Sequence, residues 1–249
     1  DFFIKKNLKF IVDCSYGEKL VTNNLSPNEP YKPDLRDLYN LYQFIILNKR
    51  ITVLEFGSGW STLIFTLALS ELKRRYINKV KHLRRNNVFE LFTVDNEKKF
   101  LNISKNRIKF FLNIDNKSKV NYLLTDVKMA YYGYSIVTEY KKIPICNPDF
   151  IYLDGPDQFK IKYNISGINL AHKDLMPMAC DILKIEYFLT PGTIIVVDGR
   201  AANAQFLRDH FKRKWQYNYN KVNDIHTFLL KAPVLGEYNK NQLKFYNNN

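Results

Sequence analysis

The stretch ITVLEFGSGWSTLIFTLALS, residues 51–70, joins two apolar runs through one acid and two glycines. Its first part, Ile51–Phe56, predicts a buried strand, because a short apolar run that ends at a glycine turn is typical of parallel sheets. From Ser61 onward the apolar residues recur with helical spacing, so a helix is expected directly after the turn. A strand, a glycine turn and a helix in this order are typical of nucleotide-binding sites, and we expect the turn to hold a ligand.

Strand and helix patterns continue to alternate along the rest of the chain. Further strands are predicted at 88–95, 119–126, 149–155 and 193–199, further helices at 96–112, 174–189 and 202–214, and a closing hairpin at 215–231. The strands are apolar on both faces, which indicates a parallel sheet covered by helices on both sides. We therefore expect an α/β fold with a doubly wound, Rossmann-like sheet that is mostly parallel and includes one antiparallel strand.

These patterns divide the chain into three segments. Residues 1–50 form an N-terminal extension, irregular at first and helical over 31–47, which is expected to act as a lid. Residues 51–231 form the ligand-binding domain, and residues 232–249 form a C-terminal tail that ends frayed. The basic run from Lys73 to Arg85 is interpreted as an extension of the first core helix.

The composition is that of a folded chain, with 46% hydrophobic residues and no uncharged apolar run long enough for a membrane helix. Three cysteines without CxxC spacing indicate a reducing compartment, and we expect a cytoplasmic protein. The chain begins at Asp1, which leaves open whether a targeting segment precedes it. The net charge of +14 is spread along the sequence, which argues against nucleic acid as the partner.

A carboxylate ends or follows each of the five predicted parallel strands. These residues are Glu55, Asp95, Asp126, Asp154 and Asp198. In open parallel sheets, ligands bind beyond the carboxyl ends of the strands, so we expect the five acids to surround the site.

The first turn distinguishes between two kinds of nucleotide. A dinucleotide fingerprint requires a third glycine where this chain has Thr62, and a carboxylate at Glu55 would repel a pyrophosphate. S-adenosylmethionine carries an ammonium and a sulfonium but no phosphate. The charges therefore favour S-adenosylmethionine over a dinucleotide as the cofactor.

Taken in order along the chain, these strand-end motifs resemble those of class I S-adenosylmethionine-dependent methyltransferases, over residues 51–231. The resemblance implies a sheet order of 3-2-1-4-5-7-6. It also implies that Asp95 binds the ribose hydroxyls and that Asp126 binds the adenine edge. The first motif, E-x-G-x-G and the two hydroxyl residues after it, would bind the cofactor through Glu55, Gly57, Ser58, Gly59, Ser61 and Thr62.

The ends of the fourth and fifth strands are expected to carry the chemistry. Asp154 is expected to face the methyl group, with Asp198 beside it. The motifs also resemble metal-dependent O-methyltransferases, in which both aspartates and a following Asn bind a divalent cation such as Mg²⁺. Here Gly199 replaces that Asn, so the ligand set is incomplete. If no metal is bound, His172 is the candidate general base.

The acceptor side is expected to include Arg200, Lys160 and Tyr163, which can bind an anionic acceptor. We predict an enzyme that transfers a methyl group to an oxygen of a small-molecule or saccharide-like acceptor. A non-catalytic binding or scaffold protein with the same fold stays open, as does an NAD-dependent Rossmann oxidoreductase. No motif indicates the identity of the acceptor or the oligomeric state.

Overall fold

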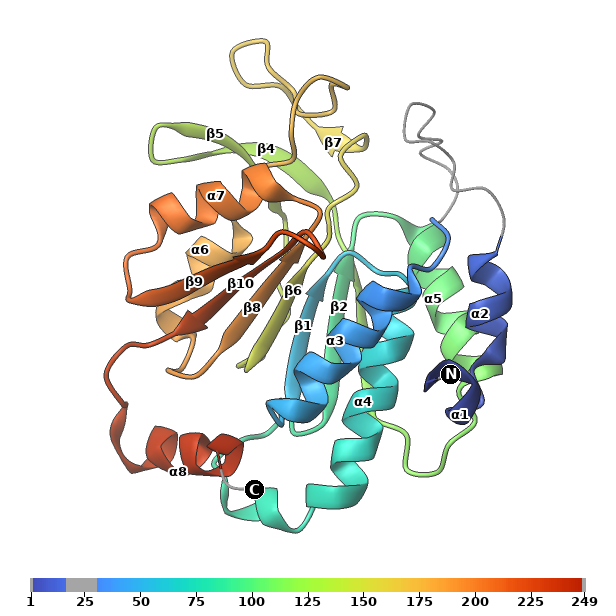
Figure 1. Cartoon of the computed structure of the whole chain (residues 1–249). Coiled ribbons are helices and arrows are strands. Elements are labelled where there is room, and N and C mark those ends of the chain that lie inside the picture. Colours follow the sequence, from blue (N-terminus) through green and yellow to red (C-terminus); the bar gives the residue numbers. More distant parts are fainter. Residues whose placement is uncertain (1, 17–30, 248–249) are drawn as a thin grey trace.

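A seven-stranded sheet forms the centre of the protein, seen in a computed structural model that describes residues 2–16 and 31–247 (Figure 1). Strand β10 runs antiparallel to both of its neighbours, whereas the other adjacent strands are parallel. Numbered along the sheet's own strands, the order is 3-2-1-4-5-7-6, as the resemblance implies. Across the sheet lie β3 (Lys119–Leu124), β2 (Glu90–Asp95), β1 (Thr52–Phe56), β6 (Phe150–Leu153), β8 (Ile194–Asp198), β10 (Ile225–Leu230) and β9 (Trp215–Asn220).

Helices cover both faces of this sheet, because its strands are apolar on both sides (Figure 1). Alternate residues of one strand enter different cores: Val53 belongs to one buried cluster, and Leu54 to the other. The first cluster contains residues of α3 (Leu35–Leu47), α4 (Trp60–Tyr76) and α5 (Lys98–Phe111), and the second contains residues of α6 (Asp181–Ile185) and α7 (Ala201–His210). The predicted α/β fold is therefore confirmed.

Several predicted helices have other limits in the structure. The helix predicted from residue 174 begins only at Asp181, and it is followed by the 3-10 turn η3 (Glu186–Phe188). The basic run does not extend α4 as predicted, since α4 ends at Tyr76 and a separate 3-10 turn, η2 (Lys79–His82), follows. At the N-terminus, α1 (Phe2–Lys5) and α2 (Lys9–Ser15) form where irregular structure was expected. The remainder of that segment, 17–30, lies outside the described residues.

Up to residue 247 the C-terminal segment is helical where a frayed tail was predicted, so that prediction is wrong for the described residues. Helix α8 (Gly236–Asn247) places Tyr246 against the sheet with 6% of its surface exposed. The Tyr246 hydroxyl donates a hydrogen bond to Asp149 Oδ2 at 2.8 Å. Asp149 Oδ1 in turn accepts from the backbone N–H groups of Ile51 and Thr52 at 3.0 and 2.9 Å, which connects α8 to the start of β1.

A second, three-stranded sheet was not anticipated from the sequence. It consists of β4 (Val127–Tyr132), β5 (Ser135–Tyr140) and the short β7 (Ile161–Lys162), in the order β5-β4-β7. Strands β4 and β5 form a hairpin whose turn contains Gly133 with φ of 58°. Within the two described ranges, no helix is long and apolar enough to cross a membrane.

Candidate active site

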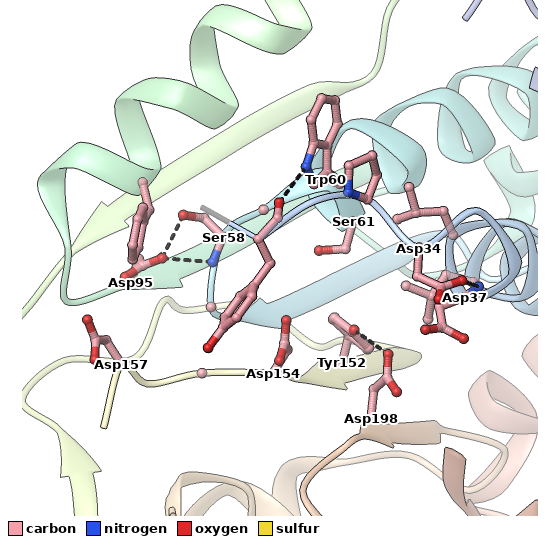
Figure 2. A pocket seen from close by; sticks show the side chains of 18 of the residues that line it. Asp34, Asp37, Ser58, Trp60, Ser61, Asp95, Tyr152, Asp154, Asp157 and Asp198 are labelled. Carbon is pink, nitrogen blue, oxygen red and sulfur yellow. Dashed lines mark hydrogen bonds between the residues drawn. The ribbon is translucent and has the colours of Figure 1, made fainter. Parts of the chain in front are cut away.

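A cavity of about 370 Å³ lies beyond the carboxyl ends of β1, β2, β6 and β8, where an open α/β sheet binds its ligands. Figure 2 shows carboxylates from several elements directed into it, with Asp95 and Asp157 on one side, Asp154 between, and Asp198, Asp34 and Asp37 on the other. The remaining walls include the turn after β1, the first residues of α4, and side chains from α5 and from the start of α7.

The first glycine of the turn lines the cavity and packs closely against a neighbouring loop. Gly57 has φ of +91°, and a Cβ there would lie 2.7 Å from the backbone nitrogen of Gly155. A Cβ on Gly155 would conversely lie 2.5 Å from the nitrogen of Gly57. The two glycines therefore allow the loops after β1 and β6 to touch. Gly59 is different, because a Cβ there would meet only Ser61 Oγ, at 3.7 Å.

Glu55 holds the turn against helix α4 and does not line the cavity. Its carboxyl group is fully buried and accepts hydrogen bonds from Ser61 Oγ at 2.6 Å and Thr62 Oγ1 at 2.8 Å. Burial raises the pKa of Glu55 to about 8, although these hydroxyl groups oppose the shift. The structure therefore does not bring the Glu55 charge to a ligand, and the expected repulsion of a pyrophosphate cannot come from this residue.

Asp95 binds the same turn from the cavity side. Its Oδ2 accepts from the backbone N–H of Ser58 at 2.8 Å and from Ser58 Oγ at 2.6 Å, while Oδ1 accepts from the N–H of Glu97 at 2.8 Å (Figure 2). Burial raises the pKa of Asp95, and these hydrogen bonds oppose the increase. The turn amide that a pyrophosphate would need is therefore occupied by a carboxylate of the chain itself.

Asp154 and Asp198 end two adjacent strands, as predicted, and both line the cavity. The Asp154 side chain is 55% exposed, but the exposed surface faces the cavity, whose walls limit its hydration. Desolvation raises the pKa of Asp154 to about 6; Arg200 opposes this increase and Asp95 adds to it. The pKa of Asp198 also rises to about 6, from desolvation and then from the charge of Asp154, while a 3.0 Å hydrogen bond donated by Tyr152 opposes it.

Arg200, a predicted acceptor residue, lies beside this pair. Its Nη2 donates to the carbonyl oxygens of Asp154 and Pro156 at 2.6 and 3.1 Å, and its Nε lies 3.8 Å from Asp154 Oδ1. The guanidinium group is thus fixed to the loop after β6 and supplies a positive charge at the acceptor side of the cavity.

The residues around this pair do not fit a divalent cation. Gly199 offers no side-chain ligand, and both ends of the Asn203 amide are hydrogen-bonded to the backbone of Ala179, at 2.9 and 3.0 Å. The guanidinium of Arg200 already stands beside Asp154. Over the described part of the chain, no group of three His, Cys, Asp or Glu residues is arranged to hold a metal ion.

Besides Glu55 and Thr62, four predicted site residues lie outside the cavity. Asp126 pairs with Lys162 at 2.9 Å, and Lys160 pairs with Glu97. His172 is 63% exposed, and its Nδ1 accepts from the N–H of Asp174 at 3.2 Å. Tyr163 is exposed. The loop after β6 follows another path than expected, because β7 pairs with β4 and draws this segment to the second sheet.

Other cavity residues were not singled out from the sequence. Asp34 begins α3, where its Oδ1 accepts from the N–H of Arg36 at 2.9 Å, and Asp37 follows in the first turn. The sequence Pro33-Asp34 is typical of the start of a helix, and this signal could have indicated that Asp34 lies at a helix end close to the site. Trp60 and Arg107, from α4 and α5, carried no such signal, because each fits an ordinary amphipathic helix.

Several solved structures are similar to this chain at low sequence identity. No protein-family model matches the sequence, and no curated protein does. An O-methyltransferase from Bacillus cereus, solved with S-adenosylhomocysteine, is 13% identical, with 93% of this chain and 91% of that chain covered and a TM-score of 0.43. The O-methyltransferase TomG from Streptomyces achromogenes, solved with S-adenosylmethionine, is 12% identical, with 92% and 96% covered and a TM-score of 0.43. A methyltransferase from Podospora anserina, bound to S-adenosylhomocysteine, is 14% identical, with 93% and 97% covered and a TM-score of 0.40.

The strand order and the cavity at its carboxyl edge define a Rossmann-like α/β protein. This strand order is the one that the resemblance to class I S-adenosylmethionine-dependent methyltransferases implies. The likeness to the solved structures is one of fold.

Proposed function

We propose that this protein transfers a methyl group from S-adenosylmethionine to an oxygen of a small-molecule or saccharide-like acceptor. The observation that carries the proposal is the arrangement of three carboxylates in one cavity. Asp95 lines the cavity at the end of β2, whereas Asp154 and Asp198 stand together at the ends of β6 and β8. The first position suits a ribose diol, and the other two suit an acceptor hydroxyl that must lose a proton.

The turn after β1 favours a nucleoside without phosphate. The Ser58 N–H donates to Asp95, and the Gly57 N–H donates to the carbonyl oxygen of Val94 at 2.8 Å, so both turn amides are occupied. A dinucleotide would have to displace Asp95 from the Ser58 amide to bind its pyrophosphate there. The occupied amide of Ser58 therefore disfavours an NAD-dependent oxidoreductase, whereas the charge of the buried Glu55 does not.

When bound, S-adenosylmethionine would supply an electrophilic methyl group on its sulfonium. The acceptor hydroxyl would lie against Asp154 and Asp198, whose pKa values of about 6 leave the pair largely ionised at neutral pH. One of these carboxylates would accept the hydroxyl proton when the acceptor oxygen takes up the methyl group. Arg200 supports the reaction by fixing the Asp154 loop and by lowering the electrostatic cost of the two adjacent carboxylates.

The N-terminal extension, residues 1–50, is proposed to select the acceptor as a lid on domain 51–231. Its support is that Tyr31, Asp34 and Asp37 line the cavity, the two aspartates on the side of Asp198. The Trp60 indole N–H also donates to the carbonyl of Tyr31 at 3.1 Å, which joins this extension to the first turn of α4.

Calorimetric titration with S-adenosylhomocysteine, run beside NAD⁺, tests the proposed cofactor. We expect saturable one-to-one binding of S-adenosylhomocysteine and no heat from NAD⁺. Binding of NAD⁺ alone would reverse the assignment in favour of the oxidoreductase. Binding of neither compound would favour a scaffold protein that keeps only the fold.

A further inference from the structure

Arg107 is a buried cation that the proposed reaction does not use. It lies on α5 with 9% of its surface exposed, and it lines the cavity. Its guanidinium stacks on the Trp60 ring, with Cζ 3.5 Å from the ring centroid. Across residues 2–16 and 31–247, no carboxylate or carbonyl forms an ion pair or hydrogen bond with it. Burial accordingly lowers the pKa of Arg107 to about 10.

The first turn of α4 meets the same part of the cavity. This 17-residue helix begins at Trp60 without a side-chain cap and with no acid in its first turn. The N–H of Gly59 is satisfied by Thr62 Oγ1 at 3.0 Å, but Trp60 and Ser61 follow it along the cavity wall. Uncapped N–H groups at the start of a long helix attract anions, and the helix dipole adds to the attraction.

We propose that Arg107 and the first turn of α4 form an anion subsite, which binds a carboxylate or phosphate group of a ligand in the cavity. A buried guanidinium without a counter-charge is costly, and an oxyanion beside it would remove that cost. Asp95, Asp154 and Asp198 line other parts of the cavity and repel an anion. The cation on that side, Arg200, already donates to the carbonyl oxygens of Asp154 and Pro156, whereas Arg107 has no such donor contact within the described residues.

Two ligands can supply such a group. One is the α-carboxylate of the methyl donor, a possibility that rests on the proposed function. The other is an acidic group of the acceptor. Both present the same oxyanion chemistry to Arg107, and they differ in whether the subsite stays free once the donor product has bound.

The subsite itself is tested with inorganic phosphate as the probe, on the full chain. The rise in melting temperature with phosphate is measured against chloride at equal ionic strength, for the wild type, Arg107→Met and Lys109→Met. Lys109 is the matched control, because it is an exposed cation on the same helix and does not line the cavity. We expect phosphate to stabilise the wild type and Lys109→Met, and Arg107→Met to lose this response. An equal response in all three proteins would overturn the proposal.

The source of the anion is tested by calorimetry with S-adenosylhomocysteine and 5′-methylthioadenosine, which lacks the amino-acid carboxylate. If the donor supplies the anion, Arg107→Met weakens S-adenosylhomocysteine binding by about tenfold or more and leaves 5′-methylthioadenosine binding unchanged. S-adenosylhomocysteine then also abolishes the phosphate response of the wild type. If the acceptor supplies it, both nucleosides bind the variant normally and phosphate still stabilises the protein saturated with S-adenosylhomocysteine.

A second variant tests the subsite if Arg107→Met does not fold. Should Arg107→Met unfold, Arg107→Lys keeps a charge but loses the planar fork, and we expect it to weaken the phosphate response without abolishing it. If phosphate stabilised Arg107→Lys as much as the wild type, the planar guanidinium of Arg107 would not be needed to bind the anion, which would contradict the proposal. Should the wild type bind neither nucleoside, the proposed cofactor is wrong, whereas the phosphate comparison still decides on the anion subsite.

Discussion

The two halves of the cavity are built in different ways. On the proposed donor side, Ser58 donates two hydrogen bonds to the carboxylate of Asp95. Behind the cavity wall, Ser61 and Thr62 donate to the buried Glu55. On the proposed acceptor side, desolvation raises the pKa of both Asp154 and Asp198, the charge of Asp154 adds to the shift at Asp198, and the two carboxylates have few donors from the chain. In the proposed reaction, the half around Asp95 is organised before a ligand binds, whereas the half around Asp154 and Asp198 keeps carboxylates for proton transfer.

The largest expected effect is on the acceptor side. Asp154→Asn removes a proton acceptor, so the rate of methyl transfer is expected to fall by about 10²–10⁴-fold. Affinity for S-adenosylhomocysteine should stay within a factor of about two to three, if the two halves work separately. Single-turnover kinetics and calorimetry measure the two quantities. A parallel loss of nucleoside binding would place Asp154 in the donor half and break the distinction.

A smaller effect is expected for Asp95→Ala on the donor side. This change removes the proposed ribose acceptor and releases Ser58, so binding of S-adenosylhomocysteine should weaken by about tenfold to a hundredfold. Calorimetric titration gives the affinity, with Asp126→Ala as the control, because Asp126 pairs with Lys162 outside the cavity. Equal losses in both variants would show that the effect does not come from the cavity contact.

The contact between the two halves can be tested on stability. In Gly155→Ala the new methyl group would meet the backbone of Gly57 at 2.5 Å, so unfolding should become easier by about 1–3 kcal/mol. Gly59→Ala is the matched control, since the nearest atom there is a side-chain oxygen at 3.7 Å, and it should change stability by no more than about 0.5 kcal/mol. Urea denaturation measures both, and equal stability of the two variants would contradict the close approach of the loops.

The pH dependence of the methyl-transfer rate tests whether Asp154 or Asp198 accepts the proton. Because the pKa values of Asp154 and Asp198 are about 6, the pair becomes protonated as the pH falls through 6. The rate should therefore decrease by about tenfold per pH unit below this point and level off above pH 7. A rate profile measured from pH 4.5 to 8.5 tests this, with nucleoside affinity measured across the same range. A profile flat down to pH 4.5 would mean that neither carboxylate takes the proton.

The smallest effect is expected at His172, the general base that the sequence suggested. Its ring is exposed and lies outside the cavity, so His172→Ala should leave the transfer rate within about twofold of the wild type. Steady-state kinetics is the measurement. A loss as large as that of Asp154→Asn would require the loop after β6 to bring the imidazole to the acceptor.

The sequence predicts the main sheet well and the loops poorly, for a physical reason. Four strands of the main sheet are buried on both faces, so each is rich in apolar residues and has a carboxylate at or beside its end. These are β1, β2, β6 and β8. The hairpin β4–β5 was missed because it follows β3 with only a two-residue gap and alternates buried with exposed residues. No local sequence pattern predicts the pairing of β4 with β7.

The same difference explains which site residues were found. Asp95, Asp154 and Asp198 follow from their positions at strand ends, and Arg200 from its place directly after β8. The positions of Lys160, Tyr163 and His172 depend instead on a long-range strand pairing, which local pattern does not encode. Arg107 was missed for the opposite reason, since a charged residue on an amphipathic helix is typical of a solvated face.

The contact of α8 with Asp149 has a consequence for how the chain matures on the ribosome. Asp149 holds the start of β1 and comes directly before β6, yet its hydrogen-bonding partner Tyr246 is translated 97 residues later. Until that residue emerges, one buried carboxylate oxygen at the amino-terminal edge of the sheet lacks the tyrosine hydroxyl. The central strands can pair early during synthesis, but this edge is completed only when almost the whole described chain has been made.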